Sequence, residues 1–138
     1  MKEFITGIAM LLLMCVFILQ FTTNQILHNK MVMAESDINV YVEQIKQDGC
    51  ASSAAAEDLK AKLSSDLKVD PGDIEIDVDD GIKNRGELIA YSVTYPLEGV
   101  IGAGGFFGIS TEDNIVRRTR DGYCASEHIE EDTFEDAL

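Results

Sequence analysis

Few residues of this 138-residue chain have the types and spacing that catalysis requires. The two histidines, His28 and His128, lie far apart in the sequence, and no nucleophile motif accompanies either of them. The best candidate nucleophile is Cys124, but the acidic residues around it would raise the pKa of its thiol rather than lower it. We therefore expect no catalytic residues, no cofactor and no enzymatic activity.

The acidic run from Asp73 to Asp80 is the one segment with the composition of a cation site. A calcium-binding EF loop needs acidic residues at alternate positions, then a glycine at the sixth and a glutamate at the twelfth. Counted from Glu75, these two places hold Asp80 and Gly86, so the pattern fails. The cysteines contain no close pair that would suggest zinc. We expect no metal site.

A glycine-rich loop between residues 97 and 109 is the most unusual outer segment. Gly102 and Gly104 match the first glycines of a dinucleotide-binding loop, but Phe107 occupies the third place. Exposed apolar segments usually mark interaction surfaces. The loop could pack on its own domain, dip into a bilayer surface or contact a neighbouring subunit. We assign five of its residues to a partner-contact surface: Val100, Ile101, Phe106, Phe107 and Ile109.

The element that must position everything else is an uncharged stretch from Phe4 to Phe21. As a helix it would span ~27 Å, about the thickness of a bilayer core. A cleaved signal peptide and a core helix are the alternatives to an uncleaved membrane anchor. The residues after Gln20 make a poor cleavage site, and a helix that is apolar all round is rare in a small soluble domain. We therefore expect residues 4–21 to span a membrane.

Charge predicts how this anchor is oriented. Lys2 and the α-amino group precede it, so the positive-inside tendency leaves residues 1–3 in the cytoplasm and the rest outside the inner membrane. The chain has a formal net charge of −14, which argues against a nucleic-acid partner because phosphate binding needs clustered Lys and Arg. We expect a single-pass membrane protein with an extracytoplasmic head.

An oxidising outer compartment would permit a disulfide between Cys50 and Cys124, the two cysteines outside the membrane stretch. Such a bond would close a loop of about 75 residues and stabilise the head by ~4 kcal/mol. Two separate free thiols are the alternative. Cys15 lies within the membrane stretch and is expected to be a small apolar residue there.

The helix is expected to continue as a stalk over residues 22–48. A narrow apolar stripe recurs there at alternating steps of four and three, as one helix face requires. The stripe is either the face on which the head packs or a coiled-coil seam with another chain. Together with Glu3 and Phe4, we assign its residues to helix packing in assembly: Leu27, Met31, Ala34, Ile38, Tyr41 and Ile45.

Residues 49–124 are expected to form a small α+β head. Ala54 to Leu67 predicts a short second helix with Ser52 or Ser53 as its N-cap. The alternation from Asp73 to Asp79 predicts a half-buried strand, Leu88 to Tyr95 a second that stops at Pro96, and Asn114 to Tyr123 a third. Residues 125–138 hold six acidic side chains and no lysine or arginine, which predicts a disordered tail.

The arrangement of Glu3-Phe4 before an apolar helix, a helical stalk and a small α+β head resembles the TadE-like minor pilins, or pseudopilins, of tight-adherence pili. These belong to the type IV pilin superfamily. Val93-Thr94-Tyr95-Pro96 before the glycine-rich loop and Ile115-Val116-Arg117-Arg118 also resemble that family. The chain departs from it in two respects. Only Met1 and Lys2 stand where a processing site is usual, and the common proline of the membrane helix is missing.

The resemblance implies a non-catalytic assembly protein of a pilus or secretion apparatus. Its partners would be the membrane and other pilin-like subunits, and it would be oligomeric in the assembly. The resemblance also implies that Glu3 could neutralise the N-terminus of a neighbouring copy, unless it simply lies among the lipid headgroups. The alternatives are a membrane-tethered extracytoplasmic binding module and an accessory subunit of a membrane complex.

Overall fold

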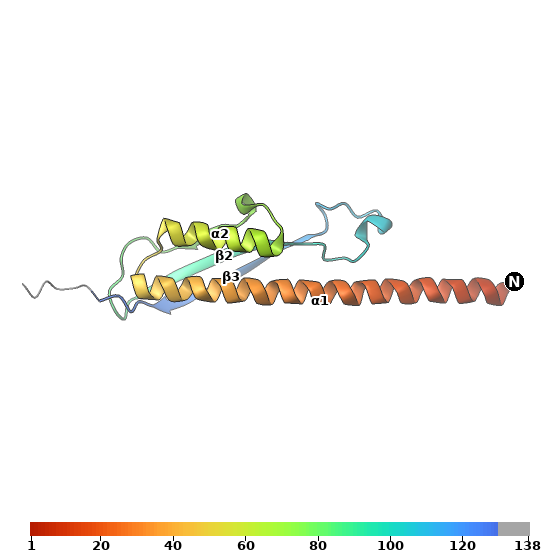
Figure 1. Cartoon of the computed structure of the whole chain (residues 1–138), viewed down its shortest axis with the longest axis horizontal. Coiled ribbons are helices and arrows are strands. Elements are labelled where there is room, and N and C mark those ends of the chain that lie inside the picture. The colour runs from red at the N-terminus through yellow and green to blue at the C-terminus, as the bar shows by residue number, and fades with distance from the viewer. Residues whose placement is uncertain (130–138) are drawn as a thin grey trace, which may run out of the picture.

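The computed structural model describes residues 1–129 and shows a long helix with a small α+β head along its second half (Figure 1). The predicted α+β fold class is confirmed. The helices and strands are α1 (Lys2–Asp48), α2 (Ser53–Leu67), β1 (Glu75–Val78), β2 (Leu88–Glu98) and β3 (Ile115–Ala125). Two short 3-10 helices, η1 (Pro71–Asp73) and η2 (Gly104–Phe107), lie in the connections.

The helix α1 is unbroken over 47 residues, which corresponds to ~70 Å at the ordinary rise of an α-helix. No proline or glycine interrupts it between Ile8 and Asp48, so every turn keeps its hydrogen bonds. Gly49 ends it in the left-handed conformation, with φ of 69°, and donates its N–H to the carbonyl of Ile45. This is the backbone conformation that glycine adopts without steric cost.

The helix α2 begins where the sequence predicts. The Ser52 side chain accepts a hydrogen bond from the backbone N–H of Ala55 and so caps the first turn. Leu59, Leu63 and Leu67 follow at helical spacing and are buried against α1 and the sheet. A single apolar face therefore attaches α2 to the rest of the head.

The three strands form one antiparallel sheet in the order β1-β2-β3. Ile76 of β1 is paired with Val93 of β2, and Val93 is paired with Arg120 of β3. The alternation expected for the first strand is observed, because Ile74, Ile76 and Val78 face the helices while Glu75 and Asp77 face solvent.

The expectation that Pro96 ends the second strand is wrong, since β2 continues to Glu98. Asp79 donates its backbone N–H to the carbonyl of Ala90, and Gly99 donates its own to the carbonyl of Asn114. The backbone N–H and C=O groups of even-numbered β2 residues therefore point toward β1, and those of odd-numbered residues point toward β3. β1 reaches only to Glu75, which pairs with Thr94. Pro96 therefore lies past the end of β1, where a missing N–H breaks no pairing between strands.

The core lies between the second half of α1, the apolar face of α2 and the inner face of the sheet. Ala34, Ile38, Tyr41 and Ile45 of the predicted stripe are at most 2% exposed, and Leu27 and Met31 pack against them while partly buried. The apolar stripe of α1 thus packs into the core of its own chain. It is not open to another helix, so the coiled-coil interpretation and its assignment to assembly do not apply in this conformation.

The sequence prediction placed the start of the disordered tail, residue 125, too early in the chain. β3 extends to Ala125, Ser126 is 2% exposed, and its Oγ donates to the carbonyl of Lys83 at 2.7 Å. The N–H of Glu127 bonds to the carbonyl of Lys46. These bonds attach Ser126 to the connection between β1 and β2, and Glu127 to the end of α1. The rest of the predicted tail, from residue 130, lies outside the described residues.

Candidate functional site

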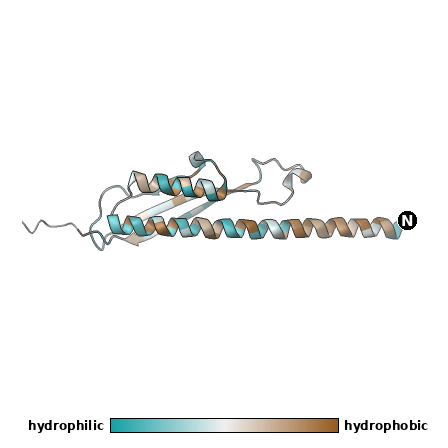
Figure 2. Cartoon of the chain, viewed as in Figure 1, coloured by the Kyte–Doolittle hydropathy of each residue, from teal (hydrophilic) through white to brown (hydrophobic). Residues whose placement is uncertain are grey.

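The apolar half of α1 is left uncovered by the rest of the described chain. Among the described residues, α1 is the only helix long and apolar enough to cross a membrane, and none of its most apolar window is buried inside the molecule. Figure 2 shows this half in brown, next to the mixed colours of the half that carries the head. A core helix would be covered by its own chain, so the core-helix interpretation is wrong.

Glu3 and Phe4 lie in the first turn of α1 and are both exposed, with Phe4 at 71%. Nothing in the described part of the chain packs on either of them. The rest of the apolar half is equally open, and its larger exposed side chains are Ile5, Ile8, Met10, Leu11, Leu12, Leu13, Met14, Val16, Phe17, Ile18, Leu19 and Phe21.

The glycine-rich loop lies against α1 at the end of this apolar half. The Gln20 side-chain carbonyl oxygen accepts a hydrogen bond from the N–H of Gly102 at 2.9 Å, and its Nε2 donates to the carbonyl oxygen of Val100 at 3.2 Å. The contact is close, because a Cβ on Gly102 would lie 2.6 Å from Oγ1 of Thr23 and 3.1 Å from the carbonyl oxygen of Leu19. The loop therefore rests on one turn of helix.

Asn114 closes the base of the loop. Its side-chain carbonyl accepts from the N–H of Ile101 at 2.7 Å, its Nδ2 donates to the carbonyl of Ile101 at 3.0 Å, and its backbone carbonyl accepts from Gly99. Beyond this clamp Ala103 adopts a left-handed conformation with φ of 58°, which is strained for a residue with a Cβ. The chain then turns through η2.

The apolar residues assigned to partner contact fall into two groups. Phe106 is 86% exposed and Phe107 52%, and their rings meet edge to face with centroids 5.4 Å apart. Ile101 is 41% exposed, whereas Val100 and Ile109 are half-buried. The loop is thus anchored on its own chain through its backbone, while its aromatic side chains remain uncovered.

Gln20 and Asn114 were missed by the sequence reasoning. Gln20 is the one amide within the apolar stretch of residues 4–21, and such an isolated polar side chain near a membrane usually has a partner. That signal could have singled out Gln20, but not its partner, because nothing local relates Gln20 to a loop about eighty residues later.

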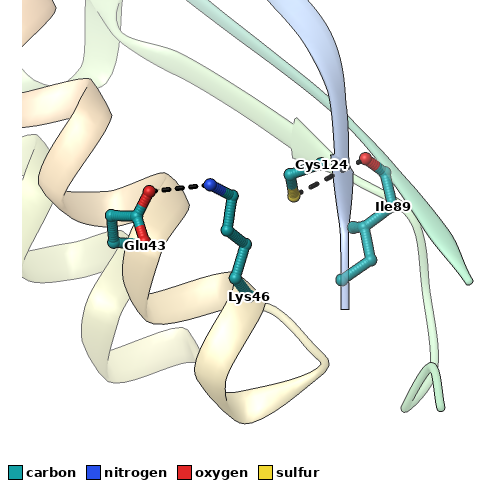
Figure 3. A network of polar contacts seen from close by, with 4 residues as sticks. All are labelled: Glu43, Lys46, Ile89 and Cys124. Carbon is teal, nitrogen blue, oxygen red and sulfur yellow. Dashed lines mark hydrogen bonds and ion pairs between the residues drawn. The ribbon is translucent and has the colours of Figure 1, made fainter. Parts of the chain in front are cut away.

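The predicted disulfide between Cys50 and Cys124 is absent, and both are free thiols. Cys124 is paired with Ile89, so its side chain faces the core, where Sγ lies 3.8 Å from the carbonyl oxygen of Ile89 (Figure 3). Cys50 lies instead in the connection that leaves α1 for α2, and it is only half-buried. The register of β3 therefore directs Cys124 inward rather than toward Cys50.

The surroundings of Cys124 also lower the reactivity of its thiol. Burial raises the pKa of this thiol above its ordinary value of 9.0, and the nearby ammonium of Lys46 offsets only part of that effect. Lys46 is itself directed to Glu43, whose carboxylate lies 2.7 Å from its Nζ (Figure 3). A thiol with a raised pKa is a poor nucleophile, as the sequence argument expected for this position.

The acidic residues do not converge on a cation site. Among residues 1–129, no group of three or more His, Cys, Asp and Glu side chains is placed to hold a metal ion. Asp77, Asp79 and Asp121 line a shallow hollow on the outer face of the sheet, around the small side chains of Ala90 and Ser92. The Asp77 carboxylate belongs to the solvated face of β1, as the alternation predicted.

Two polar groups of α1 are buried at the contact with α2. Oδ2 of Asp37 and the hydroxyl oxygen of Tyr41 have no hydrogen-bond partner within the described part of the chain. Burial, followed by the neighbouring Asp66 carboxyl, raises the pKa of Asp37 above its ordinary value of 3.8. Burial alone raises the pKa of Tyr41. Both groups lose contact with water without gaining a hydrogen bond within the described residues, which destabilises the folded head.

Comparisons with models of protein families, with curated proteins and with solved structures find no match to this chain.

Proposed function

We propose that this chain is a non-catalytic, membrane-anchored assembly protein of the TadE-like minor pilin, or pseudopilin, type. Its N-terminus would lie in the cytoplasm and its head outside the inner membrane. It would assemble with other pilin-like subunits of a pilus or secretion apparatus.

One observation carries the proposal: a single straight helix has two halves with different surroundings. The second half is covered by the head, whereas the first half is apolar, exposed and long enough to cross a bilayer. In a membrane the first half would be surrounded by lipid, and neighbouring copies could exchange that lipid for helix packing without exposing the heads to any apolar medium. This division of one helix is what a pilin-type bundle needs.

The start of the helix agrees with this role. Glu3 precedes the apolar run by one residue and is exposed, so it is accessible to the N-terminus of a neighbouring chain. A carboxylate at this depth is stabilised by a positive partner, and an α-amino group in an adjacent helix would supply one. Packing between the helices of neighbouring copies would therefore involve Glu3, Phe4 and the apolar half of α1. The stripe residues would not take part, because they lie in the core of their own chain.

Cross-linking of Cys15 in native membranes tests the proposal. Cys15 is exposed in the middle of the apolar half. A variant that keeps only this thiol, with Cys50→Ser and Cys124→Ala, should form covalent dimers when membranes are oxidised, and adding Cys15→Ser should abolish them.

Specific packing can be separated from random collision by moving the thiol around the helix. Adjacent residues of an α-helix point about 100° apart. With Cys15→Ala, a thiol introduced by Met14→Cys or Val16→Cys should therefore give a different dimer yield from that of Cys15. Equal yields at all three positions, or no dimer at any, would contradict the assembly role and favour a tethered binding module.

A further inference from the structure

The glycine-rich loop has a composition that sets it apart from the rest of an acidic head. Thirteen consecutive residues, 99–111, carry no charged side chain in a chain whose net charge is −14. Charged residues return on both sides of this run, at Glu98 and at Glu112 and Asp113. The run includes Phe106 and Phe107, two of the exposed aromatic side chains of the described chain.

The loop contacts α1 at one defined position along the helix axis. Its contacts lie between Leu19 and Thr23, where the apolar stretch ends at Phe21 and polar residues begin. One helical turn covers ~5.4 Å, so the contact falls within about one turn of the predicted membrane boundary. In Figure 1, η2, drawn in cyan, is the part of the head that reaches furthest toward the N-terminal end of α1. Along the helix axis, η2 thus lies at the level where the apolar half of α1 ends.

Many of the peptide groups of the loop are hydrogen-bonded within the protein, which lowers the cost of placing its backbone in an apolar medium. In lipid, an unpaired peptide group costs several kcal/mol, so N–H and C=O groups must find partners within the protein. Within the loop, Gly104, Phe106, Gly108 and Ile109 donate to the carbonyls of Ile101, Ala103, Gly105 and Gly104. Gln20 and Asn114 pair the peptide groups of Val100, Ile101 and Gly102. The large side chains that the loop exposes are all apolar: Ile101, Phe106 and Phe107.

We propose that η2 is a second membrane contact, whose Phe106 and Phe107 side chains insert into the interface of the bilayer that α1 crosses. Phenylalanine is one of the residues that interfacial segments carry on the face they bury in the membrane. Interfacial segments bury their apolar face by ~5–10 Å. With α1 as the first attachment and η2 as the second, the head would be held in one rotational position about the helix, and Gln20 would position the loop.

Continuity with the apolar half favours lipid as the occupant of this surface. The loop is hydrogen-bonded to the helix turn at which the apolar surface ends, so lipid that covers α1 also reaches η2. This inference rests on the membrane anchor. It does not depend on assembly with other copies, because it holds for a single chain in a bilayer.

Tryptophan fluorescence can test the contact directly, since the chain contains no tryptophan. Full-length protein with Phe106→Trp would be reconstituted into phosphatidylcholine vesicles and compared in lipid brominated near the headgroup or near the middle of the acyl chains. We expect emission at a shorter wavelength than that of tryptophan in water. We also expect a loss of intensity that is larger with the shallow bromines than with the deep ones.

Three further variants calibrate the measurement. Phe17→Trp and Phe21→Trp on α1 supply depth standards, and Phe106→Trp should give a quenching ratio close to that of Phe21→Trp. Tyr123→Trp, at a position that is 75% exposed on β3, should be quenched by neither lipid. Circular dichroism in the vesicles verifies that each variant keeps its helices.

The possible results distinguish failure of the proposed loop contact from failure of the membrane anchor. If both helix standards are quenched while Phe106→Trp emits as in water, or emits at short wavelength without quenching, the membrane contact is overturned. The second of these results would mean that protein, such as a neighbouring subunit, covers η2. If the helix standards themselves are not quenched, the anchor fails, and the proposed contact fails with it.

Discussion

The side chain of Gln20 and the backbone N–H of Gly102 are joined by a 2.9 Å hydrogen bond across 82 positions of sequence. This bond connects the last turn of the apolar stretch to the loop at the far end of β2. It places two apolar surfaces of the chain, the exposed half of α1 and the exposed rings of η2, at neighbouring levels. An amide that would be costly if unpaired near lipid is thereby satisfied.

The close approach of Gly102 to α1 predicts a specific sensitivity to its size. In Gly102→Ala the new Cβ would meet Oγ1 of Thr23 at 2.6 Å and the carbonyl of Leu19 at 3.1 Å, so the loop must move away from the helix. Loss of the two bonds to Gln20, at about 1 kcal/mol or less each, should speed hydrogen exchange of the loop by roughly tenfold. Exchange measured by mass spectrometry on peptides covering residues 98–109 provides the readout.

Gly105→Ala is the matched control, because a Cβ at Gly105 has no atom within 4 Å. Its loop peptides should exchange as in the unmodified protein. If both substitutions speed exchange equally, the effect comes from altered loop flexibility, and the described contact with α1 is not its cause.

The buried hydroxyl of Tyr41 predicts a stabilising substitution. Tyr41 is 2% exposed, and its hydroxyl has no partner among residues 1–129. Removal of an unpaired buried hydroxyl in Tyr41→Phe should raise the free energy of unfolding of the head by about 1 kcal/mol. Denaturant titration followed by circular dichroism would measure it, with Tyr123→Phe on the exposed face as the neutral comparison. A clear loss of stability in Tyr41→Phe would mean that the hydroxyl has a hydrogen-bond partner.

The raised pKa of Asp37 predicts a pH dependence of stability. Its pKa lies above the ordinary 3.8 in the folded head because of burial and the neighbouring Asp66 carboxyl, so the folded state binds this proton more tightly. The resulting stabilisation is complete below the unfolded pKa of about 3.8 and is lost as the pH rises through the raised folded value. Asp37→Asn should therefore stabilise the head at neutral pH by roughly a few tenths of a kcal/mol, because solvent screens much of the charge of a half-buried carboxylate, and gain little in acid.

Thermal unfolding at several pH values checks this expectation. Asp77→Asn, which removes one negative charge from the exposed sheet face, controls for the change in net charge. An Asp37→Asn protein that is no more stable than the unmodified one at neutral pH would show that the ionised Asp37 carboxylate is well solvated in the fold.

The inward direction of Cys124 predicts how the thiols behave. Because Cys124 is 5% exposed and its thiol pKa is raised by burial, it should react much more slowly with a maleimide in the folded head than after unfolding. All three cysteines should be alkylated when the protein is unfolded without reductant, as intact mass would report. A mass lacking two labels would instead reveal the disulfide that the structure does not contain.

Much of the fold follows from patterns between near neighbours in the sequence. The contrast between residues 4–21 and the striped residues after them, closed by Gly49, predicted α1 to within about a residue at each end, since helix caps and periodicity are local. The alternation of Ile74, Ile76 and Val78 with acids likewise predicted β1 and its buried face. Ser52 was recognised as a possible cap for the same reason.

Only the tertiary structure decided how these elements meet. Pro96 is tolerated because β1 ends at Glu75, and Cys124 faces inward because it is paired with Ile89. Both facts depend on strand register, which a one-residue shift would reverse. The bonds of Ser126 and Gln20 join segments far apart in the chain, so no local pattern could reveal them. The sequence determined which segments are apolar, and packing decided that the glycine-rich loop lies against the end of the apolar half of α1.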